Sequence, residues 1–424
     1  MSERDYADLV ARLVRTRRFG MRLELDRVLA CLDRLDHPER VPSLRVQIAG
    51  TNGKGSTSGF VESILRAGGL ATALYTSPHL LRLSERFRVG GEELSPGELI
   101  EADRAVADAA DSLALDLTFF ERLTLIAAVA FAARKVDVAI YEVGMGGRLD
   151  ATTAFCAEVA AVTGVALDHQ EHLGESLEQI AREKAGVFRP GQSAIIGLAG
   201  EPEAVAILIA AARARGVESP VVLDESAVAA VQGPLGLAGA HQRRNAACAL
   251  AVVDACADRL GIAIDDAARA SGLAGCRLPG RLERLSLEPL IVADGAHNPH
   301  AASALAAALD EVAPGARWIA VLGVSRDKDV AGVVQPIARR ADAIVATASS
   351  HERALEPGAL ADVARSSRRA VHEAPDLAAA LALARRLAAP DGAILVAGSL
   401  FLVGDARALL LGEPADPVAA TDPR

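Results

Sequence analysis

The sequence has few aromatic residues, few cysteines and no long apolar run, and each shortage excludes a class of protein. Aromatic side chains make up 3% of the 424 residues, so the hydrophobic cores must consist mainly of Ala, Val, Leu and Ile. The five cysteines are scattered without a CxxC pair, which argues against a disulfide scaffold. No apolar segment reaches membrane-spanning length, and the N-terminus lacks a signal-peptide pattern. We therefore expect a soluble, cytoplasmic protein.

Basic residues are also in the minority. Lys and Arg number 45 against 55 Asp and Glu, which gives a formal net charge of −10. This balance argues against a broad nucleic-acid footprint and leaves room for a local anion site. Hydrophobic residues make up 51% of the chain, and its length favours two globular domains. We expect a monomer without nucleic-acid or membrane partners.

The segment GTNGKGS at residues 50–56 is the most informative motif in the chain. It follows a short apolar run at residues 44–48 and precedes a helical pattern of apolar positions that starts at Phe60. A glycine-rich turn between a strand and a helix points backbone N–H groups and the positive end of the helix dipole at one spot, which suits phosphate. Lys54 adds a cation, and Ser56 adds a hydroxyl.

This segment departs from the usual phosphate-loop pattern at two positions. Ile48 stands where the first glycine is expected, and Gly55 separates the lysine from the hydroxyl. Read alone, the motif leaves an ordinary tight strand-to-helix turn open as the alternative.

A strand–helix alternation follows and predicts an α/β fold. Continuous apolar strands between alanine-rich helices indicate a parallel sheet that is covered on both faces. The first 40 residues read as helical. Strands are expected at residues 44–48, 71–76, 136–143, 158–164, 193–198 and 221–223, and helices at residues 123–134, 177–184, 203–215 and 242–260.

A break at residues 278–284 divides the chain, because proline, glycine and charge cluster there as in a hinge. The alternation then restarts in a smaller unit with the pattern of a Rossmann-like domain, which lacks GxGxxG and gives no reason to expect NAD. We expect domains at residues 1–284 and 285–412, and a disordered tail at residues 413–424. Its strands are expected at residues 289–294, 318–323, 343–346 and 393–397, and its helices include residues 299–309 and 330–339.

Polar side chains follow several predicted strands, at the edge where parallel sheets bind ligands. Ser77 and His79 follow the second strand, where a surface proline turn is the alternative. Glu142 ends an apolar strand, and a buried carboxylate needs a partner. We expect Mg²⁺ beside the phosphate loop as that partner, with an ion pair to Arg148 as the alternative.

Two further polar positions are open to more than one interpretation. His169 could bind a metal or orient a phosphate, and its spacing to His172 also suits zinc. Because no cysteine lies close and a phosphate loop is present, Mg²⁺ is the better reading. Lys184 lies at the end of a predicted helix, where the helix dipole alone explains a cation.

The second unit carries polar loops at equivalent strand ends. They are DGAHNPH at residues 294–300, RDKD at residues 326–329 and HER at residues 351–353. Because these loops fall on one edge of the second sheet, we expect them to face the first domain across a cleft.

Taken together, the motifs resemble the folylpolyglutamate synthase/dihydrofolate synthase family within the Mur-ligase superfamily. The match extends in order over residues 45–404. It implies a P-loop-containing parallel-sheet ATPase domain followed by a smaller Rossmann-like α/β domain. The motifs are GTNGKGS (50–56), YTSPHL (75–80), TFFE-LT (118–124), EVGMGGRLDAT (142–152), LDHQEHLG (167–174), REKAG (182–186), HQ-RNAA (241–247), LPGRLE (278–283), DGAHNPH (294–300), DKD (327–329) and GSLFLVG (398–404).

The resemblance implies an ATP-dependent amide ligase that adds L-glutamate to a folate or pteroate carboxylate through an acyl phosphate. It assigns ATP and Mg²⁺ as cofactors, with a monovalent cation such as K⁺ left open. Lys54, His169 and Lys184 are the expected catalytic residues, and the resemblance implies that Lys184 is carbamylated. The ATP contacts that it implies are Gly50, Thr51, Asn52, Gly53, Lys54, Gly55, Ser56, Asn245, Arg281, Asp294 and His297, and the implied metal ligands are Ser77, Glu142 and His169.

The resemblance leaves the acceptor acid open, because family members use dihydropteroate, tetrahydrofolate polyglutamates or both. We expect a bifunctional enzyme, with a ligase specific for one step as the alternative. A cell-wall Mur ligase is more distant, because about 45 residues before the phosphate loop leave no room for its additional N-terminal domain. A non-catalytic nucleotide-binding regulator is the third alternative, and the presence of Lys54, Glu142, His169 and Lys184 argues against it.

Overall fold

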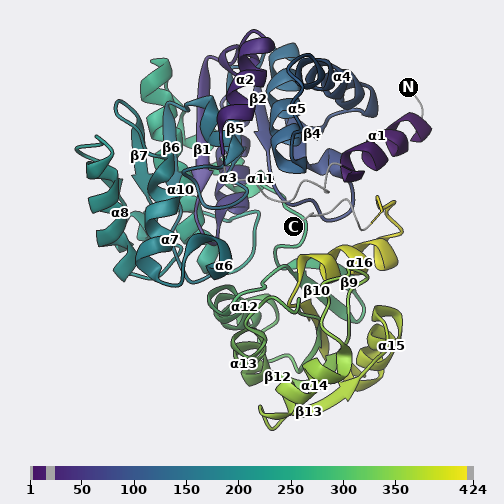
Figure 1. Ribbon diagram of the computed structural model, residues 1–424. Helices are drawn as coiled ribbons and strands as arrows, with labels where there is room; N and C mark the ends of the chain where they lie inside the picture. The colour runs from purple at the N-terminus through teal and green to yellow at the C-terminus, as the bar shows by residue number, and fades with distance from the viewer. Residues whose placement is uncertain (1–2, 16–23, 418–424) are drawn as a thin grey trace.

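The computed structural model describes residues 3–15 and 24–417 and consists of two α/β domains, one above the other in Figure 1. The first domain is built on an eight-stranded sheet whose central strand is β1. In order across the sheet, its strands are β4 (Glu92–Glu93), β3 (Phe87–Val89), β2 (Thr72–Tyr75), β5 (Val138–Glu142), β1 (Leu44–Ala49), β6 (Val159–Val162), β7 (Ser193–Ile196) and β8 (Val221–Val222).

Six of these strands are parallel, as the apolar runs predict. The hairpin β3–β4 is antiparallel and was not predicted. Its strands are only three and two residues long, and β4 is exposed, so they lack the apolar run that marks the inner strands.

Side chains of β1 alternate between the two faces of the sheet, and each face is covered by a separate layer of helices. Val46 and Ile48 pack with α3, α10 and α11, while Ala49 faces the layer that contains α7 and α8. The helices of this domain are α1 (Glu3–Arg15), α2 (Asp26–Arg34), α3 (Lys54–Ala67), α4 (Pro96–Ser112), α5 (Phe119–Ala133), α6 (Gln170–Leu173), α7 (Leu177–Lys184), α8 (Glu203–Ala214), α9 (Glu225–Ala229), α10 (His241–Leu260) and α11 (Asp266–Gly275), with short 3₁₀ turns at Pro38–Arg40, Leu83–Arg86, Ala151–Phe155 and Ala185–Val187.

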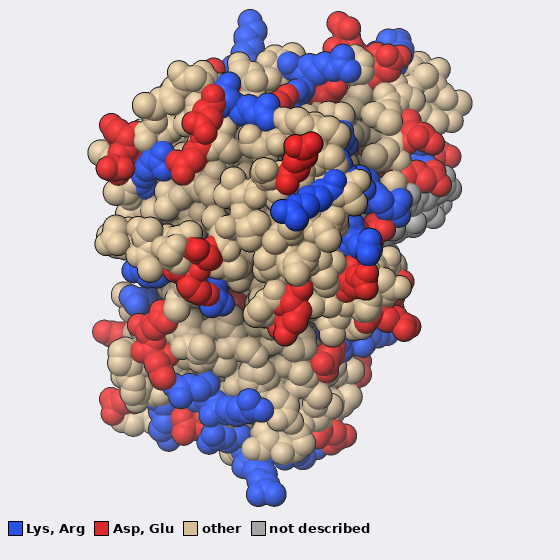
Figure 2. Space-filling view, turned by 90° about the vertical axis from the view of Figure 1, so that its left-hand side faces the viewer, with Lys and Arg blue, Asp and Glu red and all other residues tan. Residues whose placement is uncertain are grey.

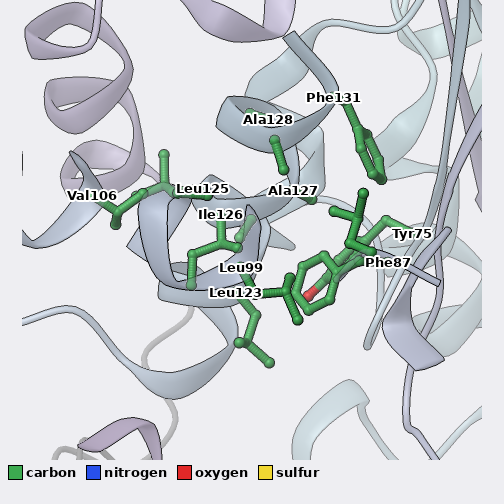
Figure 3. Close-up of a cluster of buried hydrophobic side chains, with 14 of the residues drawn as sticks. Tyr75, Phe87, Leu99, Val106, Leu123, Leu125, Ile126, Ala127, Ala128 and Phe131 are labelled. Atoms are coloured by element: carbon green, nitrogen blue, oxygen red, sulfur yellow. The ribbon is translucent and has the colours of Figure 1, made fainter. Parts of the chain in front are cut away.

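The few aromatic residues are concentrated in one core of the first domain. Figure 3 shows Tyr75 and Phe87 facing α5, whose Leu123 and Phe131 point toward the sheet. The Tyr75 and Phe87 rings lie 5.5 Å apart between centroids. This core also buries α1, α2 and α4, so the predicted N-terminal helices are part of the domain. Residues 16–23, also predicted helical, lie outside the described residues.

The second domain is a six-stranded sheet between two helical layers. Helices α12 (Pro299–Val312), α13 (Val330–Arg340) and α14 (Pro357–Arg365) cover one face, and α15 (Leu377–Ala388) and α16 (Leu400–Leu411) cover the other. In order, its strands are β13 (Ala370–Glu373), β12 (Ala341–Ala346), β11 (Trp318–Leu322), β14 (Ala393–Ala397), β10 (Leu290–Asp294) and β9 (Glu283–Leu287).

Two edge strands of this sheet differ from the sequence-based expectation. The antiparallel strand β9 begins inside the segment that we expected to be a linker, and β13 lies between the strands expected at residues 343–346 and 393–397, where no strand was expected. All side chains of β13 and all but Leu285 of β9 are half-exposed or exposed, so neither strand gives a continuous apolar run. The boundary after residue 284 stays a prediction, although β9 already belongs to the second sheet.

The chain after α16 returns to the first domain instead of leaving the surface (Figure 1). We expected disorder from Glu413 onward, but Asp416 forms hydrogen bonds with residues 81–83. The remaining residues of the expected tail, 418–424, lie outside the described residues.

Acidic and basic side chains are interspersed on the face of the molecule shown in Figure 2. Lys and Arg side chains gather at the lower end of this view, which the second domain forms. The first domain carries both signs of charge side by side in this view.

Candidate active site

A cavity of about 430 Å³ lies between the two domains and collects most of the predicted site residues. It opens at the carboxyl ends of the strands in both sheets, which is where parallel sheets bind ligands. The predicted residues that line it are Thr51, Asn52, Gly53, Lys54, Gly55, Ser56, Ser77, Glu142, His169, Asn245, Arg281, Asp294 and His297.

Two glycines of the phosphate loop are required by close packing. Gly50 has φ +147°, and a Cβ on it would lie 1.9 Å from the Thr163 hydroxyl oxygen. Gly53 has φ +81°, and a Cβ there would lie 2.2 Å from Asn245 Oδ1. The loop therefore lies directly against β6 and α10, and its chain enters α3 at Lys54.

Two lysines meet at one carbonyl of this loop. Lys54 Nζ donates to Gly50 O at 3.1 Å, and Lys184 Nζ donates to the same oxygen at 2.9 Å. Lys54 is half-buried in the cavity wall, whereas Lys184 is only 3% exposed. Burial and the neighbouring Lys54 lower the pKa of Lys184 to about 7. Lys184 does end a helix, as predicted, but it is not the surface cation that the dipole argument describes.

Gly50 and Lys184 lie behind the cavity wall and not on it, and His79 is also buried away from it. His79 Nδ1 accepts a hydrogen bond from Arg86 Nε at 2.8 Å. Burial and this guanidinium lower the pKa of His79 well below its ordinary value. The contact between His79 and Arg86 therefore joins two ends of the loop of residues 77–86. Of the two candidates Ser77 and His79, only Ser77 lines the cavity.

Glu142 is a buried carboxylate at the cavity wall. Burial raises its pKa, and the nearby Lys54 opposes that shift. Its Oε2 accepts a hydrogen bond from Ser77 N at 3.2 Å, and Gly55 leaves space in front of both carboxylate oxygens. Arg148, the alternative partner for Glu142, forms an ion pair with Glu183 at 2.9 Å.

The donor set at this wall fits Mg²⁺. Ser77, Glu142 and His169 all line the cavity beside the phosphate loop, and Mg²⁺ takes few protein ligands together with phosphate and water oxygens. Over residues 3–15 and 24–417, no three His, Cys, Asp or Glu side chains are grouped as a metal cluster. The site therefore suits an ion that arrives with phosphates, and it does not suit a zinc site closed by protein ligands.

Asp168 joins the two domains at the cavity and was not singled out from the sequence. Its carboxylate accepts from Lys328 Nζ at 2.7 Å and from Asn298 Nδ2 at 3.0 Å. Burial alone would raise its pKa, but His169, His297 and Lys328 hold the pKa well below its usual range. In the sequence, only its place in the polar motif LDHQEHLG indicates that Asp168 has a role at the site. Its partners Asn298 and Lys328 lie 130 and 160 positions away in the chain.

A pair of amides also crosses from the phosphate loop to the second domain. Asn298 Nδ2 donates to Asn52 Oδ1 at 2.9 Å, and Asn52 Nδ2 approaches Asn298 Oδ1 at 3.4 Å. Asn298 caps α12 by accepting from Ala301 N, so its position is fixed within the second domain. The second domain therefore contacts the phosphate loop directly.

The remaining predicted nucleotide contacts lie on opposite walls. Asp294 accepts from Leu282 N and Ala296 N, both at 2.9 Å, and thus fixes the start of the second domain. On the first domain, Asn245 donates to Gln242 Oε1 at 2.9 Å, while its buried Oδ1 has no protein partner among the described residues. A buried acceptor without a partner at a cavity wall is suited to an N–H group of a ligand.

The sequence matches two domain families in chain order. Residues 48–232 match the Mur ligase middle domain, and residues 280–400 match the glutamate ligase domain of Mur ligases. The dihydrofolate synthase/folylpolyglutamate synthase of Escherichia coli strain K12 is 40% identical over 323 residues, which cover 74% of each chain. The chain belongs to the folylpolyglutamate synthase/dihydrofolate synthase family. The predicted family is thus confirmed.

Solved structures of this family share the fold over nearly the whole chain. E. coli FolC in complex with DHPP and ADP has a TM-score of 0.85 and 32% identity, and the match covers 96% of this chain and 98% of that one. A bifunctional folylpolyglutamate synthase/dihydrofolate synthase with Mn, AMPPNP and L-glutamate bound has a TM-score of 0.81 and 33% identity, with coverage of 92% and 95%. The predicted two-domain α/β fold is therefore also confirmed.

The chain spans about half the length of two other curated relatives. These are probable bifunctional folylpolyglutamate synthase/dihydropteroate synthases from Halobacterium salinarum and Haloferax volcanii, which are 36% and 35% identical to it. Within the part of the chain that the structure describes, no helix has the length and apolar character needed to cross a bilayer.

Proposed function

We propose that this chain is an ATP-dependent ligase that adds L-glutamate to a folate or pteroate carboxylate. The observation that carries the proposal is a single interdomain cavity with a phosphate loop on one wall and two cations on the other. Lys54 belongs to the first wall, and Lys328 and Arg353 come from the second domain. A reaction between anions needs such cations to bring the anions together.

The arrangement suits transfer of the γ-phosphoryl group of ATP to the acid, which gives an acyl phosphate and ADP. The amine of glutamate then attacks the acyl carbon, and phosphate leaves from the tetrahedral intermediate. Lys54 and the amides at the start of α3 are placed to hold phosphate oxygens. Ser77, Glu142 and His169 would hold Mg²⁺, which supplies charge neutralisation at those oxygens when bound.

Lys184 has the environment that carbamylation requires. The neutral amine adds to CO₂, a nitrogen–carbon bond forms, and one proton is released. A buried amine whose pKa is about 7 is substantially neutral at physiological pH. We propose that the resulting anion lies behind the phosphate loop and close to Lys54, because the Lys54 and Lys184 side chains both donate to the Gly50 carbonyl oxygen.

The acceptor acid is proposed to lie beside the loop of residues 77–86, which reaches the cavity at Ser77 and Pro78. We favour use of both dihydropteroate and tetrahydrofolate polyglutamates, because the E. coli relative is named for both activities. A ligase specific for one of them is the alternative.

The test is ADP release in the presence of MgATP, with each acid and with or without L-glutamate. We expect release with both acids, dependent on glutamate and matched by amide product. ADP release that is equal without glutamate and gives no amide would refute the ligase. Lys54→Ala should lower kcat more than a hundredfold, or about 3 kcal/mol, whereas exposed Lys135→Ala serves as its control.

We also propose that the chain acts as a monomer in the cytoplasm, without nucleic-acid or membrane partners. The net charge of −10 and the mixed surface charges of Figure 2 support the absence of a nucleic-acid footprint. All five cysteines are free thiols, in keeping with a reducing compartment. Light scattering of the purified chain tests the monomer.

A further inference from the structure

The loop of residues 77–86 depends on both ends of the chain for its backbone hydrogen bonds. The amides of Leu80, Leu81 and Arg82 all donate locally to Glu85, each at 2.8 Å. The next two amides have distant partners. Leu83 N donates to Asp416 Oδ2 at 2.7 Å, and Ser84 N donates to the Tyr6 hydroxyl at 3.3 Å.

Residues 413–417, here called the C-terminal strap, hold this loop from two sides. Asp416 N donates to Leu81 O at 2.8 Å, and Asp416 Oδ2 also accepts from the Tyr6 hydroxyl at 2.9 Å. The strap is anchored in the second domain because Glu413 accepts from Arg407 of α16 at 2.6 Å. It therefore ties α16 to a loop of the first domain.

The same loop is pressed against the second domain at its other side. Leu80 packs on the core of α15 and α16. A Cβ on Gly404 of α16 would lie 2.6 Å from Leu80 O, so the backbone of α16 packs directly against the backbone of the loop at this point. The loop is thus held between the strap and the α16 helix.

The opposite end of the loop belongs to the cavity. Ser77 and Pro78 line it, and Ser77 N donates to the Glu142 carboxylate. A displacement of residues 81–84 is therefore passed along a short, hydrogen-bonded segment to the wall beside the proposed acceptor acid.

We propose that Asp416 is a positioning residue for the ligase reaction, which fixes the 77–86 loop so that the acceptor acid meets a preformed wall. This inference rests on the proposed function for the identity of that acid. Asp416 does not line the cavity, so it would act through the loop. Binding of ATP should be insensitive to it, because the hydrogen bonds of Asp416 in the described part of the chain go to Tyr6, Leu81 and Leu83 and not to the phosphate loop.

The test compares Asp416→Ala with a matched chain that ends at Pro417 and so retains every strap contact. For Asp416→Ala we expect KM for the folate or pteroate acid to rise at least fivefold, while KM for ATP changes less than twofold. Amide hydrogen exchange of a peptide containing residues 81–84 should accelerate in this variant. The chain that ends at Pro417 should match the full chain in all three measurements.

Two conservative variants sharpen the result. Tyr6→Phe keeps the buried ring but removes the hydroxyl, and it should raise the same KM in the same direction. Asp416→Asn keeps one acceptor oxygen and should be affected less than Asp416→Ala. In the double variant Tyr6→Phe/Asp416→Ala, the fold increase in KM for the acid should be smaller than the product of the two single-variant fold increases. The reason is that both substitutions remove the same hydrogen bond between Tyr6 and Asp416.

Unchanged exchange at residues 81–84 in Asp416→Ala would overturn the inference. Faster exchange with an unchanged KM for the acid would also overturn it, since the strap would then be a structural brace only. A full chain without glutamate-dependent ADP release would instead refute the proposed reaction, and the exchange result would still decide whether the strap fixes the loop.

Discussion

Replacing Lys184 with methionine tests the lowered pKa of this buried amine. The pKa of Lys184 falls from the ordinary 10.5 to about 7, which corresponds to on the order of 5 kcal/mol against the protonated form. The unfolded lysine keeps its proton up to about pH 10.5, so folding releases a proton between pH 7 and 10.5. The stability of the native chain should therefore rise across this window and be lowest, relative to the variant, below pH 7.

Lys184→Met removes that penalty together with one hydrogen bond to Gly50 O, which contributes about 1 kcal/mol. In CO₂-depleted buffer, where the Lys184 amine is unmodified, thermal unfolding should therefore show the variant to be more stable than the native chain at pH 6 and slightly less stable near pH 10. Glutamate-dependent ADP release should nevertheless fall at least a hundredfold, or about 3 kcal/mol, because the proposed carbamate is lost.

The control is Lys135→Met, since Lys135 is an exposed lysine that follows the end of α5. It should change neither activity nor the pH profile of unfolding. Intact-mass measurement of the native chain should show the added mass of one CO₂, lost on acidification. Activity of Lys184→Met within tenfold of the native chain, or a stability difference that does not vary with pH, would refute the reasoning.

Two further substitutions test the cavity walls. Glu142→Gln should raise the Mg²⁺ concentration for half-maximal activity at least tenfold without lowering the Tm, because burial already disfavours the charged carboxylate; an unchanged Mg²⁺ dependence, measured by titration at fixed ATP, would contradict the assignment. Lys328→Met leaves the Asp168 carboxylate without its lysine partner and should lower stability by about 3 kcal/mol, seen as a Tm several degrees lower in calorimetry. A Tm within about 1 °C of the native value would show that the pair contributes little.

The sequence predicts the inner strands and the phosphate loop because each has a local cause. Strands β1, β5 and β6 are buried on both faces and therefore form continuous apolar runs. The glycines of residues 50–56 mark the sharp turn that the structure requires. The missed strands β4 and β9 are edge strands: β4 is exposed and β9 has one buried side chain, so neither carries such a pattern.

The environment of site residues was less predictable, since it depends on contacts between distant segments. Lys184 reads as a helix-end cation, and its burial arises from contact with Gly50, 134 positions away. The role of Asp168 in joining the two domains is visible only in the structure, where Lys328 and Asn298 of the second domain donate hydrogen bonds to it. Local patterns locate such residues at strand ends, but the fold sets their charge state.

The amide pair between Asn52 and Asn298 has a thermodynamic consequence for the order in which ligands bind. It connects the loop that is proposed to hold ATP to the second domain, which matches the glutamate ligase domain of Mur ligases. A change in how one domain packs on the other would then alter the binding affinity of both ATP and glutamate. Linkage requires reciprocity: the factor by which glutamate tightens nucleotide binding must equal the factor by which nucleotide tightens glutamate binding. The measured affinity of each ligand is then a property of the pair.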